Sequence, residues 1–141
     1  MPVVIIDIPS GLKSSAKAQL HKDAFESMHH AYQMPDCRVF LREWAAEHTC
    51  FDDGIGGAFR PICHYIVPPT LTAESRQTLV SRMSSAVNRA CDLRTEVVKL
   101  PGGEEVSTQW VLQFFFEVPL DLAALDGLMA SENPMVPKDK H

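Results

Sequence analysis

Short apolar runs and one long amphipathic segment alternate along the first half of the chain. Pro2–Ile8 is rich in β-branched residues and is followed by Pro9–Gly11, a pattern typical of a buried strand that ends in a turn. Apolar positions recur at helical spacing over Ser14–Tyr32, which predicts an amphipathic helix of about five turns. Cys37–Trp44 alternates in the manner of a strand. We therefore expect a β-α-β unit within residues 2–58.

A second unit of the same kind follows in residues 59–118. Ile62–Val67 predicts a strand. Thr72–Cys91 predicts a helix that begins at a threonine N-cap and carries a buried stripe. Thr95–Leu100 predicts the strand that returns to the sheet. The order of elements is thus the same as in the first unit.

The two units match in pattern, which indicates a duplication. An alignment without gaps places Pro2 opposite Pro61 and pairs apolar positions along both units. Thr108–Val118 predicts an extra strand, and an apolar strand this late in a chain often reaches across to a neighbouring subunit. Residues 119–141 form a C-terminal tail, which we expect to be disordered from Asn133 onward.

Right-handed crossovers in both units predict one α/β (α+β) domain over residues 1–141. Its four-stranded sheet carries two helices on one face. The other face still presents apolar side chains, and no further helix of comparable length remains in the chain to cover it. We therefore expect an oligomer that packs this sheet face inward.

Composition excludes several classes of protein. The chain has 141 residues, of which 45% are hydrophobic, enough for a buried core. Its net charge of -5, with no basic stripe, argues against binding to nucleic acid. The apolar run Val3–Ile6 is too short for a signal peptide or a membrane span, so we expect no membrane association and a cytoplasmic location.

The cysteines and acidic pairs suggest no cofactor chemistry. The four cysteines form no CxxC pair, and we interpret them as free structural thiols. Asp52 and Asp53 have no further ligands at a useful spacing, so we expect no metal. A flavin- or nucleotide-binding protein is a weak alternative, because no glycine-rich loop follows the first strand.

Pro2 is the candidate with the most specific chemistry. Removal of Met1, which is favoured by a small second residue, would leave a secondary amine directly before a strand. An α-amino group titrates near ~8, and burial or nearby cations favour its neutral form. Such an amine is a general base at neutral pH. An acylated Pro2 would lack this function.

Two arginines share one face of the predicted strand Cys37–Trp44. An arginine fork suits a carboxylate and stabilises the charge of an enolate. Arg38 is the preferred ligand, whereas Arg42 serves either the same site or a salt bridge between subunits.

A duplicated β-α-β unit that begins at Pro2 resembles the tautomerase superfamily over residues 2–118. The strand Arg38–Trp44 and the turn Gly54–Gly57 are similar to those of 4-oxalocrotonate tautomerase. The resemblance implies an N-terminal proline as catalytic base or acid, homotrimers of fused units, no cofactor, and small 2-oxo, enol or haloacrylate acids as substrates. It also implies that Arg38 binds a substrate carboxylate.

The same resemblance adds residues to the substrate site and leaves the reaction open. Trp110 is similar in position to an active-site tryptophan of malonate semialdehyde decarboxylase. Gln109 and His29 lie near functional positions of cis-3-chloroacrylic acid dehalogenase. Leu12 replaces an arginine of the tautomerase, and Pro68–Leu71 lacks the paired arginines of the decarboxylase and the dehalogenase.

The expected function is that of a cofactor-independent tautomerase (an isomerase) that acts on a small 2-oxo or unsaturated carboxylic acid. Hydratase, dehalogenase or decarboxylase activity is the alternative within the superfamily. A non-catalytic trimeric binding protein, in which Pro2 is idle, is the alternative from another class.

Overall fold

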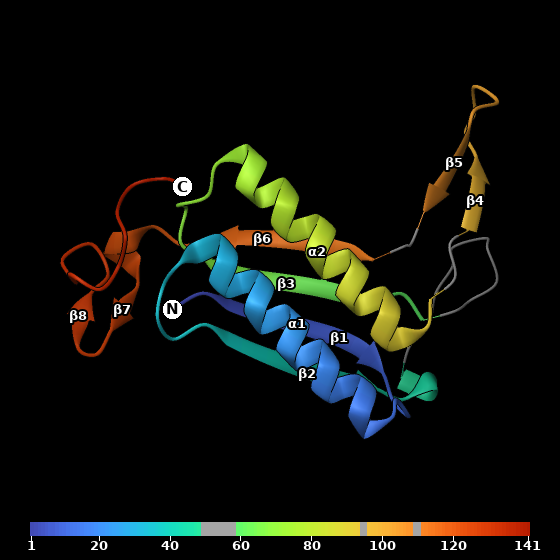
Figure 1. Cartoon of the computed structure of the whole chain (residues 1–141), viewed down its shortest axis with the longest axis horizontal. Helices are drawn as coiled ribbons and strands as arrows, with labels where there is room; N and C mark the ends of the chain where they lie inside the picture. Colours follow the sequence, from blue (N-terminus) through green and yellow to red (C-terminus); the bar gives the residue numbers. More distant parts are fainter. Residues whose placement is uncertain (49–58, 94–95, 109–110) are drawn as a thin grey trace.

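A four-stranded sheet with two helices on one face forms the body of the molecule (Figure 1). The structure is a computed structural model and describes residues 1–48, 59–93, 96–108 and 111–141. The strands are β1 (Val3–Pro9), β2 (Arg38–Trp44), β3 (Ile62–Val67) and β6 (Leu112–Glu117). The helices are α1 (Ser14–Tyr32) and α2 (Ala73–Cys91), and a 3-10 turn, η1 (Ala46–His48), follows β2. The predicted α+β architecture is confirmed.

The sheet is mixed, in the order β2-β1-β3-β6. β1 and β2 are parallel, β3 and β6 are parallel, and the two pairs meet through the antiparallel neighbours β1 and β3. Each parallel pair belongs to one β-α-β unit. The two units therefore lie side by side with their first strands in the middle of the sheet.

The duplication is visible in the helix ends. Each bound of α2 lies 59 positions after the corresponding bound of α1, the same offset that separates Pro61 from Pro2. Both helices end at a left-handed residue, Gln33 with φ 53° and Asp92 with φ 50°. These two residues donate their backbone N–H groups back to the last turn, which satisfies carbonyls that a helix end leaves free.

The predicted return strand Thr95–Leu100 is wrong. β4 (Glu96–Lys99) pairs instead with β5 (Glu105–Thr108) in a separate hairpin, and β6 is the fourth strand of the main sheet. β6 lies within the segment that we expected to reach a neighbouring subunit. Arg38 and Leu112, which begin the two return strands, are 74 positions apart, so the second unit has 15 more residues before its return strand. The three consecutive phenylalanines of β6 supply more apolar surface than β4 does.

The core lies between the sheet and the helices. Tyr65 in β3 is fully buried, its ring stacks on Phe115 with centroids 4.2 Å apart, and its hydroxyl donates to Gln113 at 2.6 Å. Fully buried side chains of β1, β3 and both helices lie in the same core: Val4, Ile6, Ile8, Leu20, Ala24, Met28, Cys63, Met83 and Val87. Alternate positions of β1 therefore point to the helices, as a strand with one covered face requires.

The opposite face of the sheet, here called the outer face, is apolar and uncovered within the chain. Its exposed large side chains come from β2, β3 and β6: Phe40, Trp44, Ile66, Leu112, Phe114 and Phe116. These side chains are adjacent in register, since Ile66 pairs with Phe116 and His64 pairs with Phe114. A contiguous apolar surface of this kind marks an interaction site.

The C-terminal segment, residues 119–141, is folded, and the expectation of disorder from Asn133 is wrong. It contains η2 (Leu120–Leu122), β7 (Ala124–Leu125) and β8 (Leu128–Met129), and it lies beside the N-terminus (Figure 1). Asn133 and Val136 are buried. The ammonium of Lys138 donates to three backbone carbonyls of this segment. The His141 ring contacts the backbone carbonyl of Tyr32 at 2.8 Å.

None of the helices in the described ranges is long and apolar enough to cross a membrane. Cys37, Cys63 and Cys91 carry free thiols. Cys50, Asp52, Asp53 and the glycine turn 54–57 lie outside the described residues. Within the part of the chain that the structure describes, no cluster of His, Cys, Asp and Glu has the geometry of a metal site.

Candidate functional site at the N-terminus

Pro2 is buried at the start of β1, where the first strand of the chain enters the sheet. Its carbonyl accepts a hydrogen bond from the backbone N–H of Arg38 at 2.9 Å. The second unit repeats this bond, because Leu112 donates to the carbonyl of Pro61 at 3.1 Å. The pairing of β1 with β2 therefore places the N-terminus directly beside the first residue of β2.

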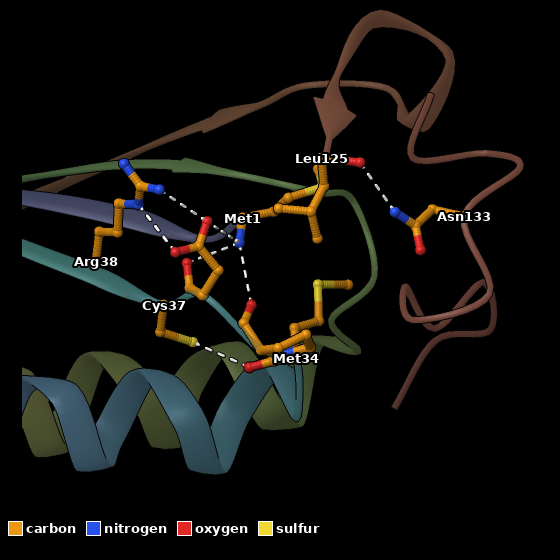
Figure 2. A network of polar contacts seen from close by, with 8 residues as sticks. Met1, Met34, Cys37, Arg38, Leu125 and Asn133 are labelled. Atoms are coloured by element: carbon orange, nitrogen blue, oxygen red, sulfur yellow. Dashed lines mark hydrogen bonds and ion pairs between the residues drawn. The ribbon is translucent and has the colours of Figure 1, made fainter. Parts of the chain in front are cut away.

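Asp36 connects the N-terminus to Arg38 (Figure 2). Its carboxylate accepts two hydrogen bonds from the Arg38 guanidinium, from Nε at 3.0 Å and from Nη2 at 3.1 Å. The ammonium of Met1 donates to the backbone carbonyls of Asp36 at 2.8 Å and Pro35 at 3.1 Å. Asp36 adopts a left-handed conformation with φ 61°, which aspartate tolerates better than most residues. This turn brings an amine, a carboxylate and a guanidinium together.

The N-terminal amine lies in a partly buried environment. Burial lowers the pKa of the Met1 ammonium below its ordinary value, the negative charge of Asp36 opposes this effect, and Arg38 adds to it. The hydrogen bond from Arg38 lowers the pKa of the Asp36 carboxyl group. Burial raises the pKa of the nearby Cys37 thiol, which donates to the backbone carbonyl of Met34. The surroundings of the amine therefore favour a neutral nitrogen next to a fixed guanidinium.

Arg42 is held by a different carboxylate, four positions farther along β2 than Arg38. Asp7 accepts from Arg42 Nε at 2.6 Å and Nη2 at 2.9 Å, accepts from Trp44 Nε1 at 2.8 Å, and lies 2.8 Å from His64 Nε2. Burial opposes ionisation of Asp7, but the hydrogen bonds from these partners prevail and lower its pKa to about 2. Arg42 therefore has an ion-pair partner within its own chain.

The two arginines lie on one sheet face but at different ends of β2. Arg38 is paired in register with Val3, next to Pro2, whereas Arg42 is paired with Asp7, whose partner on β3 is Ile62. Within one chain, the structure thus brings Arg38 together with Pro2 and leaves Arg42 at the opposite end of the strand.

Among the remaining predicted site residues, the structure describes only His29 and does not bring it to Pro2 within the chain. His29 lies on the exposed surface of α1, where its ring stacks on Phe25 with centroids 6.0 Å apart. That position is in the helix layer, away from the outer face that carries Arg38. Gln109 and Trp110 lie outside the described residues.

The second unit does not repeat the charged arrangement. Its counterpart of Arg38 is Leu112, and its internal proline, Pro61, has no free amine. The offset of 59 positions between the two units makes Ile66 the counterpart of Asp7. Each chain therefore has one end of the sheet suited to amine chemistry.

Sequence reasoning missed Asp36, which stands between Arg38 and the N-terminus. An acidic residue two positions before a candidate arginine, directly after Pro35, was the available signal. It also missed two residues of the C-terminal segment: Leu125, which Figure 2 shows near Met1, and Asn133, which donates to the Leu125 carbonyl. No local pattern near residue 2 points to them.

No protein-family model and no curated protein matches the sequence. Solved structures do match. A fused 4-OT, in a symmetric trimer, is 18% identical with a TM-score of 0.72 and aligns with 93% of this chain and 99% of its own. Pt0534 inactivated by 2-oxo-3-pentynoate is 18% identical with a TM-score of 0.67, covering 92% of this chain and 96% of its own. Malonate semialdehyde decarboxylase is 16% identical with a TM-score of 0.63, covering 92% and 94%. At these identities the likeness shows a shared fold over nearly the whole chain.

Proposed function

We propose, for a chain that has the fold of the tautomerase superfamily, that the protein is a cofactor-independent tautomerase whose general base is the amine of Pro2 after removal of Met1. One observation carries this proposal: the buried N-terminus lies beside a guanidinium that Asp36 holds in place. The substrate class is a small 2-oxo or unsaturated carboxylic acid, because an arginine fork and a neutral amine suit a carboxylate and an acidic C–H bond.

The reaction moves one proton from carbon to oxygen or to another carbon. The lone pair of the Pro2 nitrogen takes the proton from the carbon next to the carbonyl, so that the C–H bond breaks, an N–H bond forms and the electrons move onto the carbonyl oxygen. The Arg38 guanidinium holds the carboxylate and stabilises the enolate charge. The Pro2 ammonium then returns the proton to the product, and the amine is regenerated.

We also propose that the protein is a homotrimer that packs the outer face inward. The uncovered phenylalanines of β6 support this assembly, and so do the trimers of the fused 4-OT structures. Burial of this face would place the Asp7 and Arg42 pair within the trimer.

Replacement of the proline tests the proposed base. Pro2→Ala should lower kcat for the enolisation of phenylpyruvate by ~10²- to 10⁴-fold, because alanine keeps an amine but changes its basicity and loses the ring that orients the lone pair. Pro61→Ala is the matched control, since it changes the corresponding proline of the second unit, which has no free amine. Equal activity of Pro2→Ala and the parent would exclude Pro2 as the base.

Mass measurements test the same proposal without a known substrate. The intact mass should show the loss of Met1. 2-Oxo-3-pentynoate should then add once to the N-terminal peptide: the neutral amine forms a bond to the alkyne carbon, and its proton moves to the adjacent carbon. A chain that retains Met1, or that carries no label on this peptide, contradicts the mechanism.

A trimeric binding protein without catalysis is the second candidate. It is favoured by the two hydrogen bonds between Asp36 and Arg38, which occupy one edge of the guanidinium. In that case a small carboxylate should bind in calorimetry, and Pro2→Ala should leave its affinity unchanged.

A further inference from the structure

Met1 fills the space directly before Pro2. Its side chain is only 9% exposed and packs against the hydrophobic core. Its ammonium is anchored to the backbone carbonyls of Pro35 and Asp36. Because Met1 is bonded to the Pro2 nitrogen, its removal frees this space and the new amine at the same time.

The walls of this space differ in chemistry. Figure 2 shows Arg38 on one side of Met1 and Leu125 on the other, with Met34 close by. The Arg38 guanidinium is bonded to the Asp36 carboxylate. Met34 is 1% exposed, and Leu125 is half-buried against the same core as Met1. A 2-oxo acid matches this division, because its carboxylate suits the guanidinium and its carbon chain suits the apolar side.

Leu125 is held in place by contacts of the C-terminal segment. Its backbone carbonyl accepts from Nδ2 of the Asn133 side chain at 3.0 Å. The other end of that side-chain amide, Oδ1, accepts from the backbone N–H of Met135 at 2.9 Å. The tight turn between β7 and β8 has positive φ at Asp126 and Gly127. Since Asn133 is buried and both ends of its amide are bonded, the wall is preformed.

We infer that Leu125 is the apolar wall of the substrate pocket and limits the size of the substrate that reaches Pro2. This inference rests on the proposed function and extends it, because it assigns substrate selection to a residue outside both β-α-β units. The side chain acts by filling volume. A smaller residue at position 125 should admit a bulkier substituent, and a larger one should exclude it.

Two substitutions of Leu125 test the wall. The readout is the ratio of kcat/KM for phenylpyruvate to kcat/KM for 2-hydroxy-2,4-pentadienoate, which is smaller. Leu125→Ala should raise this ratio about 10-fold or more, and Leu125→Phe should lower it, since pocket contacts of one to a few methylenes are worth 10- to 200-fold. Leu122→Ala is the control, because Leu122 lies in the same segment but is 71% exposed. Its ratio should stay at the parent value.

The outcomes separate this inference from the function on which it rests. A parent protein that neither turns over the probes nor is labelled by 2-oxo-3-pentynoate at Pro2 overturns both. An active parent whose ratio is kept by both Leu125 variants overturns the wall alone. Rates of labelling by 2-oxo-3-pentynoate and by the bulkier 4-phenyl-2-oxo-3-butynoate give an independent measure, and Leu125→Ala should speed the second selectively.

Discussion

Asp36 lies between the two groups that the proposed reaction needs. Its carboxylate takes the Nε and Nη2 edge of Arg38, so that the planar guanidinium keeps its opposite edge for another carboxylate. Its charge also acts on the N-terminal amine, whose nitrogen in Met1 lies 3.8 Å from Asp36 Oδ2. Consecutive backbone nitrogens are less than ~4 Å apart, so the Pro2 amine of the processed chain stays within about 8 Å of this carboxylate. In the proposed reaction, Asp36 would therefore position Arg38 and act on the Pro2 amine through its charge.

Replacement of Asp36 by asparagine should shift the pH profile. The negative charge of Asp36 raises the pKa of the Met1 ammonium. A charge this close acts in the same direction on the Pro2 amine of the processed chain, so Asp36→Asn should lower the pKa of that amine. Because the neutral amine is the active form in the proposed mechanism, the acid limb of the profile of kcat/KM against pH should move to lower pH. Asp36→Glu, which keeps the charge, should keep the limb near its parent position. A limb that does not move in Asp36→Asn would show that Asp36 has no electrostatic effect on the base.

The two helices have equal lengths but differ at their N-termini. Thr72 accepts a hydrogen bond from the backbone N–H of Ser75 at 3.2 Å and so caps α2. Lys13 stands at the corresponding position of α1 and makes no such bond. The free N–H groups at a helix start need partners, and a threonine side chain supplies one. The side chain at the N-cap of α2 therefore contributes to the free energy of unfolding, whereas the side chain at the N-cap of α1 makes no capping bond.

Thr72→Ala should lower the free energy of unfolding by ~1 kcal/mol, the usual contribution of an N-cap. Lys13→Ala is the matched control at the corresponding position of α1 and should stay within about 0.5 kcal/mol of the parent. Urea titrations of both variants measure the difference. Equal midpoints for the two variants would mean that the Thr72 cap contributes nothing to stability.

The whole molecule has two layers, and the apolar outer face of its sheet is typical of a surface that a third layer covers. The helices cover one face of the sheet, and the outer face remains exposed with Phe40, Phe114 and Phe116 about half accessible. Surfaces of this kind are rare on monomers. A second copy of the same face supplies apolar surface of the same character, and this is the physical basis for the proposed trimer.

A charge on the outer face should break the assembly. Phe116→Lys would bury an ammonium without a partner in the trimer, which costs several kcal/mol, so sedimentation should report monomers. Phe25→Lys is the matched control, because Phe25 is similarly exposed but lies on the helix layer. It should sediment like the parent. A parent protein that sediments as a monomer would contradict the trimer directly.

The sequence alone determined the elements that depend on local pattern. The helices follow from apolar positions at helical spacing and from their terminal residues. β1 and β3 follow from short runs rich in β-branched residues, and β2 follows from its alternating pattern. The duplication was visible because the offset of 59 positions holds from Pro2 to the end of α2. Pro2 and Arg38 were likewise predictable as neighbours, since β-α-β units place two parallel strands side by side.

Only the tertiary structure decided which late strand joins the sheet and what surrounds the N-terminus. The sequence predicts strands at both β4 and β6, but which of them pairs with β3 depends on contacts across the whole second unit. The second unit has 15 more residues before its return strand, so the alignment of the two units did not identify β6 as the counterpart of β2. Leu125 reaches the N-terminus through a segment more than 100 positions away in sequence. Asp7 likewise meets His64, 57 positions away, only because β1 and β3 pair in the sheet. Local periodicity fixes which residues form an element, whereas such distant contacts depend on packing that no short window of sequence contains.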